Sequence, residues 1–276
     1  MILDGKRLRD KILENLSEKL AKSDKKPTLA VILAGDDPAS RIYVNNKKKT
    51  AEKIGINSVV YEYPGSISEN ELLGKIKELN EDDSVTAILV QLPLPDGISK
   101  ENVINAINPK KDVDGLTRQN VGKMFSGEKP YVYPCTPKGI IAILDEYGIE
   151  IEGKKAVVVG RSNLVGRPVA QMLLDRNATV TTCHSKTKNL SEITKTADIL
   201  VSAVGKQIIK SGMVKEGAVV IDVGISRTED GKICGDVDFE NVSKIASYIT
   251  PVPGGVGPMT IASLMSNTVE LFYIRE

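Results

Sequence analysis

The sequence predicts an α/β fold in which parallel sheets are flanked by helices. Apolar runs of strand length recur along the chain, and segments with the apolar spacing of amphipathic helices separate them. At 276 residues the chain is longer than a typical single domain. We therefore expect two domains, each large enough to bury its own core.

The first half of the chain carries three predicted strands. An amphipathic helix begins in MILDGKRLRD, almost at the first residue. Strands are expected at residues 28–34 (TLAVILA), 59–63 (VVYEY) and 85–90 (VTAILV), with helices at about 40–55 and 69–80. Residues 91–136 are rich in Pro, Gly, Asn and Asp and are expected to form a loop. The loop ends at Thr136-Pro137, a favourable N-cap followed by Pro at the first helical position, so we place a boundary near 136.

The second half repeats the alternation. Strands are expected near residues 155–159, 178–183, 197–202 and 218–223, before TPVPGGVGPMT (250–260) and a final helix at about 259–273. We expect that helix to return to the first domain. Residues 1–136 would then form one α/β domain, completed by residues 258–276, and residues 137–257 would form the other.

Composition excludes several classes of partner. Lys and Arg total 37 against 36 Asp and Glu, so no overall field favours nucleic acid or an anionic membrane, and a small metabolite fits better. Cys135, Cys183 and Cys234 lack CxxC spacing, which argues against a disulfide framework and against a zinc site or other metal centre. No apolar run of 18 residues and no signal peptide are apparent, so a cytoplasmic location is expected.

Residues 155–185 are the most informative segment, because they read as strand, glycine turn, helix and second strand. Val157–Val159 would be a buried strand, and Gly160 would let the backbone turn so that the N-terminal amides of the next helix face a pyrophosphate. Gly166 follows at a spacing that differs from GxGxxG, so the fingerprint alone is weak. An ordinary buried strand followed by a helix start remains the alternative.

The end of the second strand indicates which dinucleotide would bind. An NAD site carries an acid there, about 20 residues after the glycine turn, to hold the ribose 2′-hydroxyl. Here the strand ends Cys183-His184-Ser185-Lys186, without an acid, and Ser185, Lys186 and Arg161 could all donate to a 2′-phosphate. We therefore predict a Rossmann-type domain that binds NADP. The expected cofactor-binding residues are Gly160, Arg161, Ser162, Gly166 and Ser185.

Tyr43 and Lys47 form a second candidate pair. Four residues apart on a predicted helix, they share one face and could address one ligand. The alternative is a solvated charged face with a packed tyrosine, which the run of three lysines favours. Successive helical residues point about 100° apart, however, so Lys47, Lys48 and Lys49 cannot share one environment.

Three loop motifs complete the candidates. Gln91 follows VTAILV directly, and Asp114-Gly115 lies in KDVDG, both at positions where an open α/β sheet binds its ligand. Gln91 could instead satisfy loop amides, and Asp114-Gly115 could be a simple turn. Calcium fits DVDG poorly, because an EF-hand needs Gly at position six and Glu at position twelve. The glycines and prolines of TPVPGGVGPMT are typical of a rigid binding wall for a flat ligand.

Taken together, these segments resemble the bifunctional methylenetetrahydrofolate dehydrogenase/methenyltetrahydrofolate cyclohydrolase family. The resemblance covers the whole chain. It rests on YVNNKKKTAEKIGI, VQLPLP, PKKDVDG, YPCTPKG, VVVGRSNLVGRPVA, ATVTTCHSKT, IDVG, GDVDF and TPVPGGVGPMT. The chain is somewhat short for the family around residues 21–27 and 95–100.

The resemblance implies a role for each candidate. Lys47 would be the essential acid/base residue, Gln91 would hold and tune it, and Tyr43 and Asp114 would contact the folate. Gly254, Gly255 and Pro258 would lie in the loop that lines the substrate cleft, and Arg161 and Ser185 would contact the 2′-phosphate. The resemblance also implies a homodimer, a folate substrate and a place in one-carbon metabolism and purine biosynthesis.

The implied chemistry fits the scarcity of histidine. Hydride loss from 5,10-methylenetetrahydrofolate leaves a stabilised methenyl cation and no proton to remove, so positioning alone can suffice. The only histidine, His184, lies beside the expected adenosine ribose. Hydrolysis needs proton transfers, which Lys47 could perform if burial and the neighbouring lysines lower its pKa. A dehydrogenase without hydrolase activity and a non-catalytic NADP-binding regulatory protein are the alternatives.

Overall fold

The computed structural model describes residues 1–227 and 231–275, which form two compact units. Unit 1 consists of Met1–Asp10 and Thr136–Ser263, and unit 2 consists of Lys11–Cys135 and Leu264–Glu276. Helices α1 (Gly5–Ala21) and α10 (Val256–Arg275) contribute to both units. Among the described residues, no helix is both long and apolar enough to cross a membrane.

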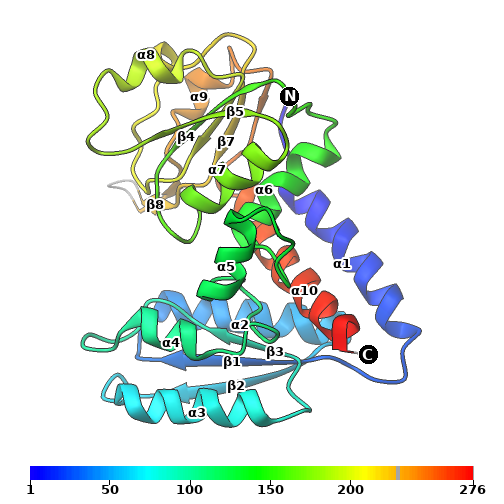
Figure 1. Cartoon of the computed structure of the whole chain (residues 1–276). Helices are drawn as coiled ribbons and strands as arrows, with labels where there is room; N and C mark the ends of the chain where they lie inside the picture. The colour runs from blue at the N-terminus through cyan, green and yellow to red at the C-terminus, as the bar shows by residue number, and fades with distance from the viewer. Residues whose placement is uncertain (228–230, 276) are drawn as a thin grey trace. The chain divides into compact units, whose positions relative to one another are not determined.

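Unit 2 is built on a three-stranded parallel sheet with the strand order β2-β1-β3 (Figure 1). Val31 of the central strand pairs with Val60 on one side and Leu89 on the other. The elements of this unit are β1 (Thr28–Ala34), α2 (Pro38–Lys53), β2 (Asn57–Tyr63), α3 (Glu69–Glu81), β3 (Ala87–Val90), α4 (Lys100–Ala106) and α5 (Arg118–Phe125).

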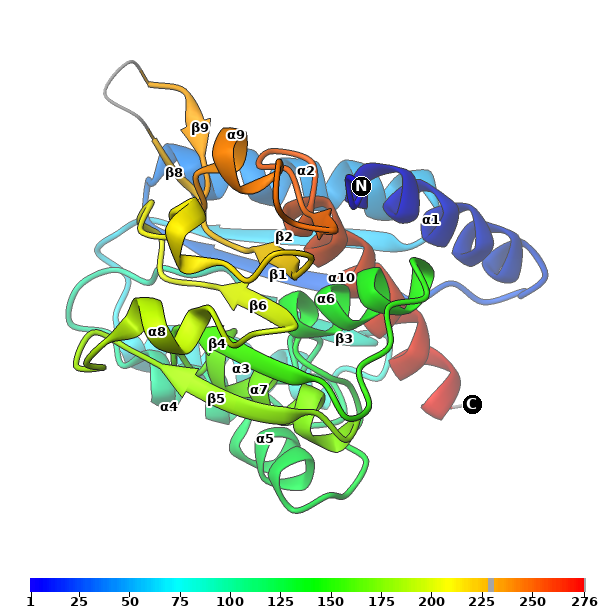
Figure 2. The same ribbon diagram turned by 90° about the horizontal axis from the view of Figure 1, so that it is seen from above.

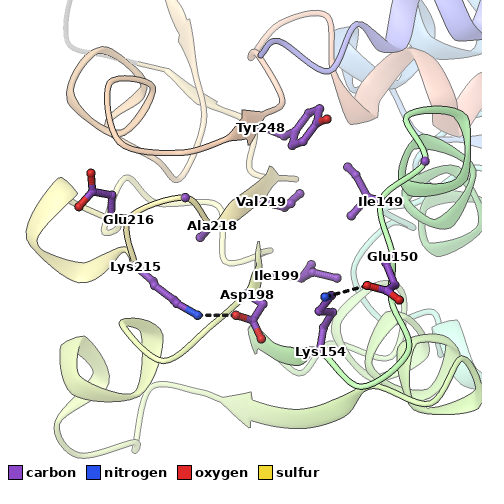
Figure 3. Close-up of a pocket in the computed structure, with 12 residues that line it drawn as sticks. Ile149, Glu150, Lys154, Asp198, Ile199, Lys215, Glu216, Ala218, Val219 and Tyr248 are labelled. Carbon is purple, nitrogen blue, oxygen red and sulfur yellow. Dashed lines mark hydrogen bonds and ion pairs between the residues drawn. The ribbon is translucent and has the colours of Figure 1, made fainter.

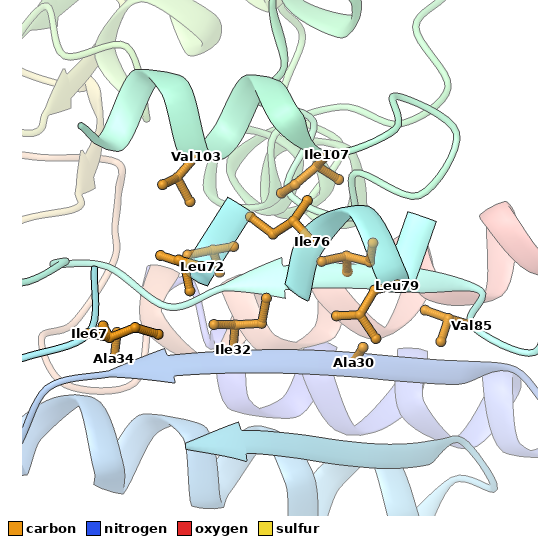
Figure 4. Close-up of a cluster of buried hydrophobic side chains, with 12 residues drawn as sticks. Ala30, Ile32, Ala34, Ile67, Leu72, Ile76, Leu79, Val85, Val103 and Ile107 are labelled. Carbon is orange, nitrogen blue, oxygen red and sulfur yellow. The ribbon is translucent and has the colours of Figure 1, made fainter. Parts of the chain in front are cut away.

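The central strand β1 is buried on both faces, as its unbroken apolar sequence requires. Ala30, Ile32 and Ala34 alternate toward one face, where they meet the apolar stripe of α3 and side chains of the α4 segment (Figure 4). The helix α2 packs on β1 and β2. The sheet is therefore open to ligands only at its edges and strand ends.

Unit 1 is built on a five-stranded parallel sheet with the order β10-β7-β6-β4-β5. Figure 2 shows β5, β4 and β6 side by side in that order. Its elements are α6 (Cys135–Glu146), β4 (Lys155–Val159), α7 (Gly166–Asp175), β5 (Thr179–Cys183), α8 (Leu190–Thr194), β6 (Ile199–Ser202), a 3₁₀ turn η1 (Ser211–Met213), β7 (Val219–Asp222), a short antiparallel hairpin of β8 (Ser226–Arg227) and β9 (Ile233–Cys234), α9 (Phe239–Val242) and β10 (Tyr248–Ile249).

The structure confirms the predicted fold class and most predicted elements, but corrects the loop at residues 91–136. That segment contains α4 and α5, whose N-caps Ser99 and Thr117 accept hydrogen bonds from the backbone N–H groups of Asn102 and Asn120. Seven or eight polar-rich residues carry too little apolar periodicity to predict a helix. The short elements β8, β9, β10, α8 and α9 were missed for the same reason.

Helix boundaries also differ at two functional segments. Helix α6 begins at Cys135, one residue before the predicted cap, and the Thr136 hydroxyl lies 3.0 Å from that of Thr260. Helix α10 begins at Val256, so Pro258 lies in its first turn and not in a loop.

The first residues of the chain group with unit 1, whereas the predicted range assigned them to the other domain. The backbone N–H of Leu3 donates to the Ile249 carbonyl at 2.9 Å, and that of Lys6 donates to the Gly254 carbonyl at 3.1 Å. These bonds extend the edge at β10. In α10, residues 256–263 group with unit 1 and residues from Leu264 onward group with unit 2.

In each unit the chain winds in one direction from a central strand and then reverses. From β1 it passes through α2 to β2 and then through α3 to β3 on the opposite side; from β4 it passes through α7 to β5 and then to β6 on the opposite side. The carboxyl ends of β1 and β4 are therefore the points where an open α/β sheet parts to receive a ligand.

Gly160 occupies this point in unit 1. Its φ is +123°, and a Cβ atom there would lie 2.5 Å from the carbonyl oxygen of Ala203, the residue that follows β6. The Ala203 N–H in turn donates to the Val159 carbonyl at 2.8 Å. Both the backbone conformation and the available space thus require glycine.

We expect Gly160→Ala to lower the free energy of unfolding by more than about 2 kcal/mol, because it combines a strained φ with an overlap against backbone. Gly153→Ala is the matched control, since Gly153 has φ +71° but no neighbouring atom within 4 Å. That control should cost only about 1 kcal/mol. Chemical denaturation of both variants measures the difference, and equal losses would contradict the steric argument.

Candidate functional site

Helix α2 places Lys47 on the face that packs against the sheet. Ser40, Val44 and Ala51 are buried and share a helical stripe with Lys47 at i, i+4, i+7 and i+11. The helix start is fixed because the Asp37 carboxylate accepts a hydrogen bond from the Ser40 N–H at 2.8 Å. A lysine therefore occupies a position where the helical pattern calls for an apolar residue.

The Lys47 amine meets Gln91 at the winding reversal of unit 2. Lys47 Nζ donates to Gln91 Oε1 at 2.8 Å, and Gln91 Nε2 donates to the Leu92 carbonyl at 2.6 Å. The second bond fixes the amide so that its oxygen faces the amine. Because an amide is neutral, Gln91 can hold Lys47 without forcing it to stay protonated, as a carboxylate would.

Burial lowers the pKa of Lys47, and the charges of Asp114 and Cys135 oppose that shift. The predicted contribution of the neighbouring lysines is not among its causes. Lys48 points elsewhere and lies 3.9 Å from Glu52, and Lys49 is exposed. The three lysines thus occupy three environments, as the helical geometry predicts.

Asp114 follows a segment that runs beside β3. The Ile88 N–H donates to the Lys111 carbonyl at 2.7 Å, which places Asp114 near the carboxyl end of that strand. Asp112 is buried and accepts hydrogen bonds from the Thr117 N–H and the Asn120 amide. Gly115 has φ +66°, and a Cβ atom there would lie 2.8 Å from the Val132 carbonyl oxygen, so the chain turns at this residue and requires glycine. Asp112 is the structural carboxylate of the motif, whereas half-buried Asp114 acts electrostatically on Lys47.

Two contributors to this site were missed in the sequence. Asn267 of α10 is fully buried, and its amide donates to the Val113 carbonyl at 2.8 Å and the Tyr133 carbonyl at 2.9 Å. It therefore ties the segment before Asp114 to the one before Cys135. The available signal for Asn267 was an amide side chain, between Ser266 and Thr268, in a helix that is otherwise mostly apolar. Cys135 entered the sequence analysis only as a cysteine without CxxC spacing, and its electrostatic effect on Lys47 had no sequence signal.

Tyr43 lies one turn before Lys47 on α2 and is 44% exposed. Its ring is thus available to a ligand, and the alternative of a packed tyrosine does not hold. Tyr43, Lys47, Gln91 and Asp114 all belong to unit 2.

The predicted cofactor residues gather at the carboxyl ends of β4 and β5 in unit 1. Val159 at the end of β4 pairs with Cys183 at the end of β5. Arg161 and Ser185 each come two residues after this pair, and both side chains are exposed. Ser162 Oγ accepts hydrogen bonds from the N–H groups of Val165 and Gly166 at 3.2 and 3.4 Å, which shapes the start of α7.

These residues fit a dinucleotide phosphate. A Cβ atom at Gly166 would overlap the Gly160 carbonyl, so the turn is held tight by two glycines ahead of a helix N-terminus. The exposed Arg161 and Ser185 supply hydrogen-bond donors. After β5, the Lys186 N–H donates to His184 Nδ1 at 3.2 Å. His184 therefore has a structural partner at the strand end.

Gly254 and Gly255 have an internal reason to be glycine. Gly254 has φ +116°, and a Cβ atom at Gly255 would lie 2.6 Å from the Thr250 side chain. A Cβ atom at Gly5 would overlap the Gly255 carbonyl, so the two segments of unit 1 pack backbone to backbone. The predicted contact of Gly254, Gly255 and Pro258 with a ligand stays a prediction.

A cavity of about 360 Å³ in unit 1 contains none of the predicted residues. It is lined by the first residues of parallel strands, including Ile199 and Val219, so it lies at the amino edge of the sheet. Figure 3 shows its lysines paired with acids: Lys154 with Glu150 at 2.8 Å and Lys215 with Asp198 at 2.5 Å. This cavity is separate from the turn of Gly160 and Gly166, which lies at the carboxyl edge.

Comparison with known proteins matches both halves of the chain. Residues 3–114 match the tetrahydrofolate dehydrogenase/cyclohydrolase catalytic domain, and residues 134–276 match the tetrahydrofolate dehydrogenase/cyclohydrolase NAD(P)-binding domain. The bifunctional protein FolD of Halalkalibacterium halodurans is 56% identical over 274 residues, which cover 98% of each chain.

Solved structures agree with this match. The bifunctional FolD methylenetetrahydrofolate dehydrogenase/cyclohydrolase of Campylobacter jejuni has a TM-score of 0.98 at 54% identity, covering 100% of this chain and 99% of that one. The N5,N10-methylenetetrahydrofolate dehydrogenase-cyclohydrolase of Trypanosoma brucei, complexed with NADP and an inhibitor, has a TM-score of 0.95 at 36% identity, covering 100% and 98%.

Proposed function

This chain belongs to the tetrahydrofolate dehydrogenase/cyclohydrolase family, and from that premise we propose how its residues divide the two reactions between them. The protein is an NADP-dependent enzyme that oxidises 5,10-methylenetetrahydrofolate to 5,10-methenyltetrahydrofolate and hydrolyses that product to 10-formyltetrahydrofolate. These matches favour two activities over a dehydrogenase alone or a non-catalytic NADP-binding protein. The observation that carries the residue assignment is the hydrogen bond between Lys47 and Gln91.

Oxidation requires positioning more than proton transfer. NADP, when bound, supplies the hydride acceptor, and we assign it to the turn of Gly160, Ser162 and Gly166, with Arg161 and Ser185 on the 2′-phosphate. Removing a hydride from the methylene bridge leaves a cation that its two nitrogen atoms stabilise, and no proton has to leave. The residues of unit 1 thus need only to hold and orient the cofactor.

Hydrolysis requires a group that both accepts and donates a proton. Water adds its oxygen to the methenyl carbon and loses one proton, which leaves a hydroxyl on that carbon. The bond from the carbon to N5 then breaks as N5 gains a proton, and the hydroxyl loses its remaining proton to solvent as the formyl C=O bond forms. The lowered pKa of Lys47 favours a neutral amine that can accept the first proton and return it in the second step. Gln91 keeps the amine in place through both states, because its oxygen accepts from either form.

The remaining residues bind the substrate in this proposal. The exposed ring of Tyr43 stacks on the folate, and Asp114 accepts hydrogen bonds from the pterin while its charge faces Lys47. Gly254, Gly255 and Pro258 complete the folate site. We place the enzyme in the cytoplasm, in the supply of one-carbon units to purine biosynthesis. We also propose a homodimer, which sedimentation equilibrium should report as twice the 29.8 kDa chain mass.

Exchanging Ser185 for Asp should shift the cofactor preference toward NAD. The variant loses a charge-assisted hydrogen bond and gains repulsion against the 2′-phosphate, which together should weaken NADP binding by on the order of 2–4 kcal/mol. Ser185→Asn is the control, because it changes the size similarly without adding charge. Steady-state kinetics with both cofactors give the preference. Equal use of NAD and NADP by the unaltered enzyme would sink the assignment.

Replacing Lys47 with Met should separate the two activities. The stem is largely kept and the amine is lost, so cyclohydrolase activity should fall by about 10²–10⁴-fold. Dehydrogenase activity should survive in part, and the methenyl product should accumulate. Lys48→Met and Lys49→Met are matched controls on the same helix, and both should retain the two rates. Undiminished enzymatic hydrolysis in the Lys47 variant, after subtraction of the spontaneous reaction, would remove Lys47 from the mechanism.

A further inference from the structure

Asp236 is fully buried beside the cofactor turn of unit 1, and its carboxylate is fully engaged with β6 and the loop that follows it. Asp236 Oδ2 accepts hydrogen bonds from Ser202 Oγ at 2.9 Å and the Val204 N–H at 2.7 Å, and Oδ1 accepts one from the Lys206 N–H at 2.9 Å. Two backbone groups of residues 203–206 thus depend on this side chain for their partners. Loss of a buried acceptor leaves such groups unsatisfied.

A second buried carboxylate fixes Asp236 itself. Asp222, at the end of β7, accepts hydrogen bonds from the N–H groups of Asp236 at 2.9 Å, Val237 at 2.9 Å and Gly224 at 3.0 Å. Ser202 and Asp222 are directly paired across β6 and β7. The two carboxylates therefore form one network that joins the ends of both strands to the segment after β9.

Glycines reserve the space for each carboxylate. A Cβ atom at Gly224, in IDVG, would overlap the Asp236 carboxylate, and a Cβ atom at Gly235, in GDVDF, would overlap the Asp222 carboxylate. Each motif thus supplies an acid to the network and a glycine that accommodates the acid of the other. This interlocking explains two motifs that the catalytic residues leave unexplained.

The network has an electrostatic cost. Burial raises the pKa of Asp222 to about 6, the charge of Asp236 adds to the rise, and the backbone donors oppose it. Well-packed apolar side chains would fill the same space without desolvating two acids. The cost of the network points to a role beyond packing. The network holds the loop of residues 203–206, and that loop lies against Gly160.

We propose that Asp236, held by Asp222, is a positioning residue for the NADP site and acts through residues 203–206. Ala203 lies against Gly160, where a Cβ atom would come within 2.5 Å of its carbonyl oxygen, and its N–H donates to the Val159 carbonyl. A displaced loop would therefore shift the wall of the turn to which the cofactor is assigned. The inference rests on the proposed function, because it presumes that this turn holds NADP.

The test is the full-length Asp236→Asn variant, with Asp238→Asn as its matched control. Asn keeps one acceptor oxygen and turns a donor toward groups that already donate. Asp238 is an acid two residues further on, and its carboxylate accepts a hydrogen bond from the side-chain amide of Asn241 in α9 at 3.0 Å. Calorimetric titration gives the Kd for NADP, and cyclohydrolase activity is measured on supplied methenyltetrahydrofolate, a reaction that consumes no NADP.

We expect Asp236→Asn to raise the Kd and the KM for NADP by about tenfold or more, with cyclohydrolase activity within about twofold of wild type. Asp238→Asn should change neither. An unchanged Kd for NADP in a folded Asp236 variant, or a parallel loss of both activities, would overturn the inference. If that variant fails to fold, Ser202→Ala removes one donor and should raise the Kd by a smaller factor; an unchanged Kd there would also overturn it. A wild-type chain that does not bind NADP would overturn the proposed function as well.

Discussion

Both units depend on a reversal of winding direction around one parallel strand. Where the chain leaves β1 or β4 on one side and later returns on the other, the connecting segments diverge at the carboxyl end of that strand. The reversal leaves Gln91 beside β1 in one sheet, where its N–H donates to the Ile32 carbonyl at 2.9 Å, and Gly160 beside β6 in the other. The chemistry of each unit is thus set by the few residues that occupy this point.

The residues at the two positions differ, and the difference fits the separate tasks proposed for them. At the reversal of unit 1, glycine removes side-chain bulk and brings backbone amides forward, as an anion requires. At the reversal of unit 2, an amide holds an amine whose pKa is lowered by burial, as a proton carrier requires. In the proposed mechanism a single amine in a partly buried setting is sufficient, because only one of the two reactions moves protons.

The sequence predicted most long strands and helices because their apolar periodicity extends over enough residues to be distinctive. It also brought Lys47 and Gln91 forward as candidates. Spacing alone did not indicate that their side chains meet; the family resemblance implied that Gln91 holds Lys47, and the two are hydrogen-bonded. Residues that act through tertiary contact could not be predicted in this way. Asn267, Asp222 and Asp236 lie far apart in sequence from many of the groups they bind, and short capped helices such as α4 offer little periodicity. The glycines of TPVPGGVGPMT were assigned to ligand approach, and the structure adds an internal reason for two of them: Gly254 has φ +116°, and a Cβ atom at Gly255 would overlap Thr250.

The reciprocal arrangement of Gly224 with Asp236 and of Gly235 with Asp222 has an evolutionary consequence. Any side chain added at one glycine would collide with the acid contributed by the other segment, and any larger acid would collide with the glycine's backbone. A single substitution at either glycine would therefore disturb the carboxylate of the other segment. Loss of the network would therefore require changes in both segments together, so we expect the two motifs to change as one unit despite the hairpin between them.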